Sequence, residues 1–107
     1  MQKYIYAMRS SSALQAEPKY FIGKTNCIVE AFNSHNSPLT PCEFSRTFAP
    51  WVLCDVKHAS YKHWEELNST LYYMKLFGID NVRGAAWKAL KVRPCEKKTL
   101  SALLALR

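Results

Sequence analysis

An α+β domain, with a small three-stranded and mostly antiparallel sheet flanked by helices, is the fold that this sequence of 107 residues predicts. Two short aromatic and β-branched segments, residues 3–8 and 19–25, are separated by residues that suit a loop, which predicts an antiparallel hairpin. Between residues 61 and 77, apolar side chains recur at three- and four-residue steps, which predicts a long helix. A chain of this length accommodates one hydrophobic core.

Side chains in the first strand alternate between the two faces of the sheet. Tyr4, Tyr6 and Met8 therefore share one face, and Ile5 and Ala7 share the other. We expect Ile5 in the core and Tyr6 directed outward. In the second strand, by the same rule, one face carries Tyr20 and Ile22 and the other carries Phe21 and Gly23.

Three further elements follow the hairpin. A helix capped at Thr25 or Asn26 is expected to end near His35, because two prolines and small polar residues follow it. Residues 43–47 give no clear prediction. Residues 51–56 predict a third strand, buried on at least one face, and Ser60 is a candidate cap for the helix over 61–77.

The C-terminal part of the chain is expected to be short and mostly helical. Residues 80–84 predict a tight polar turn closed by glycine, and residues 85–92 a short strand or helical turn carrying Trp87. A last helix is expected after Pro94. We therefore divide the chain into a domain over residues 1–93 and a helix over 94–107 that packs on it or extends it.

The charge balance is strongly basic, with 15 Lys and Arg against 8 Asp and Glu and a formal net charge of +7. A positive charge of this size creates an electrostatic field that attracts polyanions, and nucleic acid is the first partner to expect. The alternative is that the excess charge serves only solubility. The basic residues that could contact a phosphate backbone are Arg9, Lys19, Lys24, Arg46, Lys57, Lys62, Lys88, Lys91, Arg93, Lys97 and Lys98.

Other classes of function find little support in the composition. No apolar segment approaches the ~20 residues of a membrane span, and no signal peptide is evident, so we expect an intracellular protein, cytoplasmic or nuclear and not secreted. The four cysteines are widely spaced without a Cys-x-x-Cys pair, so we expect free thiols. A metal site built from distant Cys and His residues stays open as a minor alternative.

Several segments together resemble the GIY-YIG nuclease superfamily, in particular its small single-domain members from large DNA viruses. Tyr4-Ile5-Tyr6 and Phe21-Ile22-Gly23 are similar to the paired signature, with Tyr4 in place of the usual Gly and Phe21 in place of the usual Tyr. The helix ending in His35, the pair Tyr73-Met74 and the segment 78–84 follow in the family's order. The resemblance implies a divalent-metal-dependent DNA endonuclease that hydrolyses phosphodiester bonds.

The resemblance also implies site residues. Tyr6 would be the base or the group that orients the attacking water, and Glu66 would hold Mg²⁺ or Mn²⁺. Lys24 and His35 would assist at the phosphate. Tyr20 is considered because the second motif's tyrosine is otherwise replaced by Phe21, which carries no hydroxyl. Without the resemblance, Tyr6 fits a half-buried aromatic, and Glu66 a solvated helix-face residue.

The family's arginine position is occupied by Ala31, eight residues after Gly23 and four before His35. A methyl group cannot replace a guanidinium that binds phosphate through two parallel hydrogen bonds. The chain is therefore expected to be inactive or strongly impaired in cleavage. Either the natural protein lacks this arginine, or the arginine was replaced by alanine.

Three functions compete at this point. The first is a DNA endonuclease acting on duplex, nicked or branched DNA, with Arg9, Lys19, Lys24, Arg46 and Arg83 contacting nucleic acid. Arg83 has an alternative structural role, as a buried ion pair between the turn and the long helix. The second function is a non-catalytic nucleic-acid-binding module on the same scaffold. The third is a protein-interaction domain using the three tryptophans and the leucine-rich tail, for which a homodimer is possible.

Overall fold

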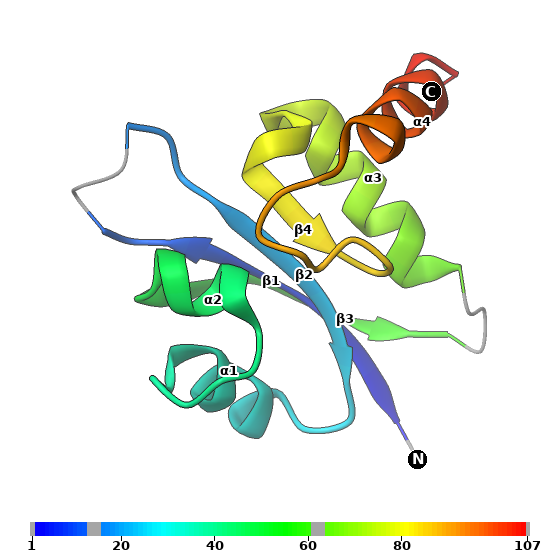
Figure 1. The fold of residues 1–107 in the computed structure, drawn as a ribbon. Coiled ribbons are helices and arrows are strands. Elements are labelled where there is room, and N and C mark those ends of the chain that lie inside the picture. The colour runs from blue at the N-terminus through cyan, green and yellow to red at the C-terminus, as the bar shows by residue number, and fades with distance from the viewer. Residues whose placement is uncertain (1, 13–15, 61–63, 107) are drawn as a thin grey trace.

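A four-stranded sheet with helices on both faces forms the fold in the computed structural model, which describes residues 2–12, 16–60 and 64–106 (Figure 1). The strand order is β3-β1-β2-β4. The bounds of the strands are Lys3–Ser10 for β1, Tyr20–Thr25 for β2, Trp51–Ala59 for β3 and Val82–Gly84 for β4. The α+β class is confirmed. The prediction of three strands was wrong, because β4 adds a short parallel strand beside β2.

The predicted hairpin of β1 and β2 is confirmed and forms the centre of the sheet. The two strands pair antiparallel, with Tyr6 directly opposite Gly23. The predicted alternation is also confirmed, since Ile5 and Ala7 belong to one hydrophobic cluster, whereas Tyr6 and Met8 belong to the other. The sheet therefore has a core on each face.

Two pairs of helices cover the two faces (Figure 1). On one face, α1 (Ile28–Asn36) and α2 (Glu43–Phe48) pack against the cluster that contains Tyr6. On the other face, α3 (Glu65–Phe77) and α4 (Pro94–Ala105) pack against the cluster that contains Ile5. The short helix α2 was not predicted, and its Phe44 is fully buried.

Burial of Tyr6 corrects one prediction. Tyr6 was expected to be directed outward, but only 5% of its surface is exposed. The reason is that α1 and α2 enclose the face on which the Tyr6 ring lies. Strand alternation alone could not reveal this, since it assigns faces without saying which face another element covers.

The strand β3 corrects another prediction. It extends to Ala59 rather than residue 56, and it lies at the edge of the sheet, where of its nine residues only Trp51 is buried. Val56, for example, is 40% exposed. The apolar segment indicated a buried strand, whereas its position beyond the last covering helix leaves it open to solvent.

The elements after β3 differ from the predictions mainly at their ends. The helix expected from about residue 61 begins at Glu65, and residues 61–63 lie outside the described part of the chain. The predicted turn is a 3₁₀ turn over Ile79–Asn81 followed by β4. Between β4 and α4, the backbone of Trp87 pairs with that of Gly84 and no longer element forms.

The C-terminal helix α4 begins at Pro94 as predicted and packs on the same core as α3. Leu100 is completely buried, whereas Leu106 is 85% exposed. Proline suits the first helical position, because the amide that it lacks would have no partner there. Among the described residues, no helix has the length and hydropathy needed to cross a bilayer.

Candidate functional site

A pocket of about 500 Å³ opens on the face of the sheet that α1 and α2 cover, and we call it the Tyr6 pocket. It is lined by segments that lie far apart in the sequence: β1, the end of β2, the end of α1, the start of α2, the first turn of α3 and the segment after β4. Four of the residues predicted to take part in chemistry line it together, namely Tyr6, Lys24, His35 and Glu66.

A chain of hydrogen bonds crosses the inner wall of the Tyr6 pocket. The Tyr6 hydroxyl lies 2.9 Å from Nε2 of His35, and Nδ1 of His35 lies 2.6 Å from Oγ of Ser45. Ser45 is fully buried on α2. A neutral imidazole donates from one nitrogen and accepts at the other, so either tautomer satisfies both contacts. The imidazole is thereby fixed between a phenol and a buried hydroxyl.

Burial keeps Tyr6 and His35, the two titratable residues of this hydrogen-bond network, neutral at pH 7. It raises the pKa of Tyr6 to about 12, with smaller contributions from the charges of Glu66 and Cys42. It lowers the pKa of His35 to about 4, with a smaller contribution from the positive charge of Lys88. The physical cause is the same in both cases, because a poorly solvated site disfavours the charged form.

Gly23 gives the Tyr6 ring its position. The ring lies across its cross-strand partner so closely that a Cβ atom at position 23 would overlap the ring carbons and the hydroxyl. The sequence had suggested that a glycine here lets another group approach the backbone. The group that approaches is the Tyr6 side chain, which explains why this strand position carries no side chain.

Glu66 lies on the first turn of α3 and lines the Tyr6 pocket, whereas its neighbour Glu65 is directed elsewhere and binds Ser60. Successive helical residues point about 100° apart, which separates the two carboxylates. Glu43, at the start of α2, also lines this pocket. Within residues 2–12, 16–60 and 64–106, no three His, Cys, Asp or Glu side chains gather to hold a metal.

The basic residues at the pocket are Lys24 and Lys88. Lys24 follows Gly23 at the end of β2 and is exposed, and Lys88 lies in the segment after β4. Ala31 lies one helical turn before His35, is partly buried, and packs against the cluster that contains Tyr6. The pocket therefore carries two lysines and no arginine among its lining residues.

Tyr20 is not part of this site. Its side chain lies on the opposite face of the sheet from Tyr6, where its ring stacks on Phe77 with a centroid distance of 4.2 Å. Only 9% of its surface is exposed. The residue that lies on the Tyr6 face is Phe21, which contacts the His35 ring.

Of the five residues predicted to contact nucleic acid, only Lys24 lines the pocket. Lys19 donates to Asn81 at 2.6 Å, and Arg46 donates to the Thr40 carbonyl at 2.7 Å. Arg9 is exposed on β1, outside the pocket.

Arg83 is buried, which is incompatible with a surface contact to nucleic acid. Its guanidinium donates to the carbonyls of Ile79, Val82, Ala89 and Leu90 at 2.7–2.9 Å. The alternative role as a structural residue therefore describes it better. Its partners are backbone carbonyls rather than the carboxylate of an ion pair, and they tie the 3₁₀ turn and β4 to the segment before α4.

Sequence reasoning missed Ser45 and Glu43, because residues 43–47 gave no clear prediction and α2 is only six residues long. The sequence carries no signal that pairs Ser45 with His35, because the two residues meet only when α2 packs beside α1. The four cysteines are free thiols, as expected. No protein-family model, curated protein or solved structure matches this chain.

Proposed function

We propose that the Tyr6 pocket binds a phosphodiester group of DNA and that the domain is built as a divalent-metal-dependent endonuclease of the GIY-YIG type that lacks the family's arginine. The observation that carries this proposal is the convergence of Tyr6, His35 and Glu66 with two lysines on one pocket. A phenol, an imidazole and a carboxylate beside cationic groups meet the needs of phosphodiester hydrolysis.

The hydrogen bond between Tyr6 and His35 supports a role for Tyr6 in water activation. With a pKa of about 12, the phenol loses its proton only if another group takes it at the same moment. Nε2 of His35, at 2.9 Å, is that group when Nδ1 carries its proton toward Ser45. Tyr6 Oη then accepts a proton from water while its own proton moves to His35. The negative phosphate in the pocket offsets the burial that otherwise disfavours the imidazolium.

Glu66 fits a metal ion that binds few protein ligands. Mg²⁺ retains several water molecules and takes phosphate oxygens as ligands, so one or two carboxylates suffice. Glu66 would hold such an ion, with Glu43 as the other carboxylate of the pocket. When bound there, the ion supplies electrostatic stabilisation of the leaving oxygen.

Ala31 favours a second candidate function, in which the scaffold binds nucleic acid without cutting it. Lys24 and Lys88 provide charge at the pocket but not the planar, bidentate donor of an arginine. This alternative expects binding that weakens as salt rises and that survives Glu66→Gln.

The experiment that separates the two functions is Ala31→Arg. If the domain is built for cleavage, the variant cuts a panel of duplex, nicked and branched DNA in Mg²⁺ or Mn²⁺ about 10²-fold or more faster than the unaltered chain. Ala31→Gln is the matched control, because it adds a long polar side chain without a guanidinium, and it should leave the rate unchanged.

A further control is the double variant Ala31→Arg with Glu66→Gln, which should return to the starting rate. If Ala31→Arg remains inactive on every substrate with both metals while DNA still binds, the endonuclease proposal is wrong and the binding module stands. If no DNA binds at low salt, both functions are excluded, and the partner surface of a protein-interaction domain becomes the candidate.

A further inference from the structure

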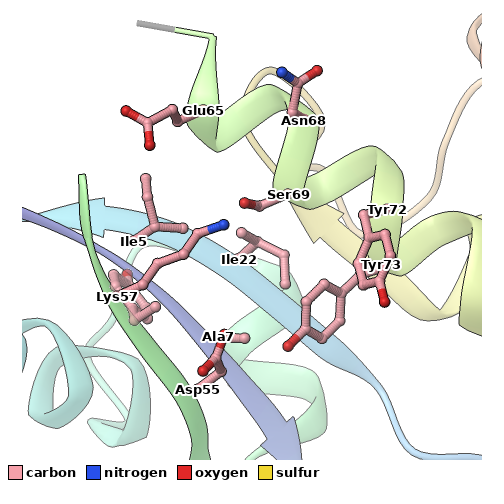
Figure 2. Close-up of a pocket in the computed structure, with 11 residues that line it drawn as sticks. Ile5, Ala7, Ile22, Asp55, Lys57, Glu65, Asn68, Ser69, Tyr72 and Tyr73 are labelled. Carbon is pink, nitrogen blue, oxygen red and sulfur yellow. The ribbon is translucent and has the colours of Figure 1, made fainter. Parts of the chain in front are cut away.

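A second pocket, of about 440 Å³, lies on the opposite face of the sheet, and we call it the Tyr72 pocket (Figure 2). It exists because α3 packs mainly on β2 and β4 and leaves the outer part of that face, formed by β1 and β3, uncovered. Its floor is apolar and consists of Ile5, Ala7 and Ile22. Figure 2 shows these three side chains between the strands and α3.

Polar groups surround this apolar floor. Asp55 and Lys57 project from β3, and Asn68 and Ser69 project from α3 (Figure 2). Within the described part of the chain, neither Asp55 nor Lys57 takes part in an ion pair. An ammonium and a carboxylate on one pocket wall match a ligand that offers both hydrogen-bond donors and an acceptor.

Aromatic surface completes the pocket. Tyr72 and Tyr73 lie on the α3 side, at the end away from Glu65 (Figure 2). Tyr72 is 58% exposed, so its ring is open to a ligand beside the apolar floor. Flat apolar ligands stack on such rings, and unstacked nucleobases are bound in this way.

The two pockets meet at the first turn of α3. Tyr6 lines both pockets, and Glu65 of the Tyr72 pocket and Glu66 of the Tyr6 pocket are consecutive residues of that turn. We propose that the Tyr72 pocket takes one unstacked guanine base of a nucleic-acid strand whose phosphate lies in the Tyr6 pocket. This inference rests on the proposed function and adds to it a base preference.

Guanine is the base whose edge matches the groups present. Its Watson–Crick edge offers two N–H donors beside one carbonyl acceptor. The Asp55 carboxylate has two acceptor oxygens for the donors, and the Lys57 ammonium is a donor for the carbonyl. Adenine carries no carbonyl for the ammonium, and cytosine offers a single amino donor to the carboxylate.

The test measures binding of short fluorescent oligothymidylate strands that carry one central dG, dI or dA, by fluorescence anisotropy at low salt. The dG strand should bind about tenfold tighter than the dA strand, since a bidentate contact discriminates by roughly this amount. The dI strand lacks the 2-amino group and should lie between them. This comparison uses the unaltered protein, so it does not depend on how a variant folds.

A pair of variants assigns the preference to the pocket. Asp55→Asn should abolish the preference for dG over dA. Glu30→Gln on α1 makes the same charge change outside both pockets and should keep the preference.

Equal affinity for dG, dI and dA, or a preference that survives Asp55→Asn, would overturn the proposal that the Tyr72 pocket binds a guanine base. Phosphate binding at the Tyr6 pocket would then stand on its own if Lys24→Ala weakens every strand equally. Absence of binding by all strands would instead reject the proposed function, and the base pocket with it.

Discussion

The hydroxyl of Tyr6 and Nε2 of His35 lie 2.9 Å apart, although 28 residues separate them in the chain and they come from β1 and α1. Their contact depends on two neighbours. Gly23 leaves room for the Tyr6 ring, and Ser45 holds the other nitrogen of His35.

Tyr6→Phe removes the hydroxyl and leaves the ring in place. In the Ala31→Arg background it should lower the rate of DNA cleavage by about 10²-fold, the usual effect of removing a general base. The free energy of unfolding should fall by only about 1 kcal/mol, because one partly buried hydrogen bond is lost. Cleavage assays and urea denaturation measure the two effects.

The control for Tyr6→Phe is Tyr4→Phe, because the Tyr4 hydroxyl donates to Gln2 in an exposed contact. It should alter neither the cleavage rate nor the stability appreciably. A Tyr6→Phe variant that cuts as fast as its parent would exclude Tyr6 from proton transfer.

Gly23→Ala should destabilise the domain, because the added Cβ overlaps the Tyr6 ring. Forcing extra volume into a packed site costs about 1–3 kcal/mol. In a Tyr6→Ala background the overlap is absent, so Gly23→Ala should then have almost no effect. Chemical denaturation of the four proteins gives the coupling energy directly, and a coupling near zero would show that the ring does not depend on the glycine.

Stability should rise between pH 4.5 and 6.5 because of His35. Its pKa is about 4 in the folded chain and near 6.5 when unfolded, so in this window the unfolded state binds the extra proton. The contribution is present above pH 6.5 and is lost as pH falls toward 4. His35 is partly exposed, so solvent screens its charge, and we expect the free energy of unfolding to change by about 1–2 kcal/mol across this window.

The measurement is urea denaturation of the unaltered protein and of His35→Gln across this pH range. The variant should show a flatter profile. Hydrogen bonds from Ser60, Lys97 and Arg93 lower the pKa values of Glu65, Asp80 and Glu96, so these carboxylates also lose stabilising interactions as pH falls. They do so equally in both proteins, and the difference between the two profiles therefore isolates His35. Parallel profiles for the two proteins would contradict the assignment to His35.

Arg83→Lys should destabilise the domain by about 2–3 kcal/mol, because an ammonium cannot reach the four carbonyls that the guanidinium binds. Arg46→Lys is the matched control. Its guanidinium donates to one carbonyl and is exposed, so the cost should be much smaller. Thermal unfolding compares the two variants, and folded Arg83→Lys should bind DNA as well as the unaltered protein, since its side chain is buried.

Local patterns in the sequence were sufficient for the elements that depend on their own residues. The alternation in β1 assigned Ile5 and Tyr6 to opposite faces, and Pro94 marked the start of α4. These features follow from the period of a strand and the fixed φ of proline, which act within a few residues. The α+β class followed from the same signals.

Contacts between distant segments decided the rest. Tyr6 is buried because α1 and α2 enclose its face, and β3 is exposed because it lies at the edge of the sheet. The strand β4 has three residues, too few for a periodic signal, and it pairs with β2 because Gly84 has no Cβ to collide with the Ile22 carbonyl and Thr70.

For the candidate site, too, the sequence determined one part and the tertiary structure the other. Its residue types and their order along the chain were present in the sequence, and the family resemblance that they suggested singled out Tyr6, His35 and Glu66. The placement of Tyr20 on the other face follows from strand alternation. The meeting of these residues on one pocket and the hydroxyl that Ser45 adds depend on how the helices pack on the sheet. Packing sets these relations because it joins side chains that no local period connects.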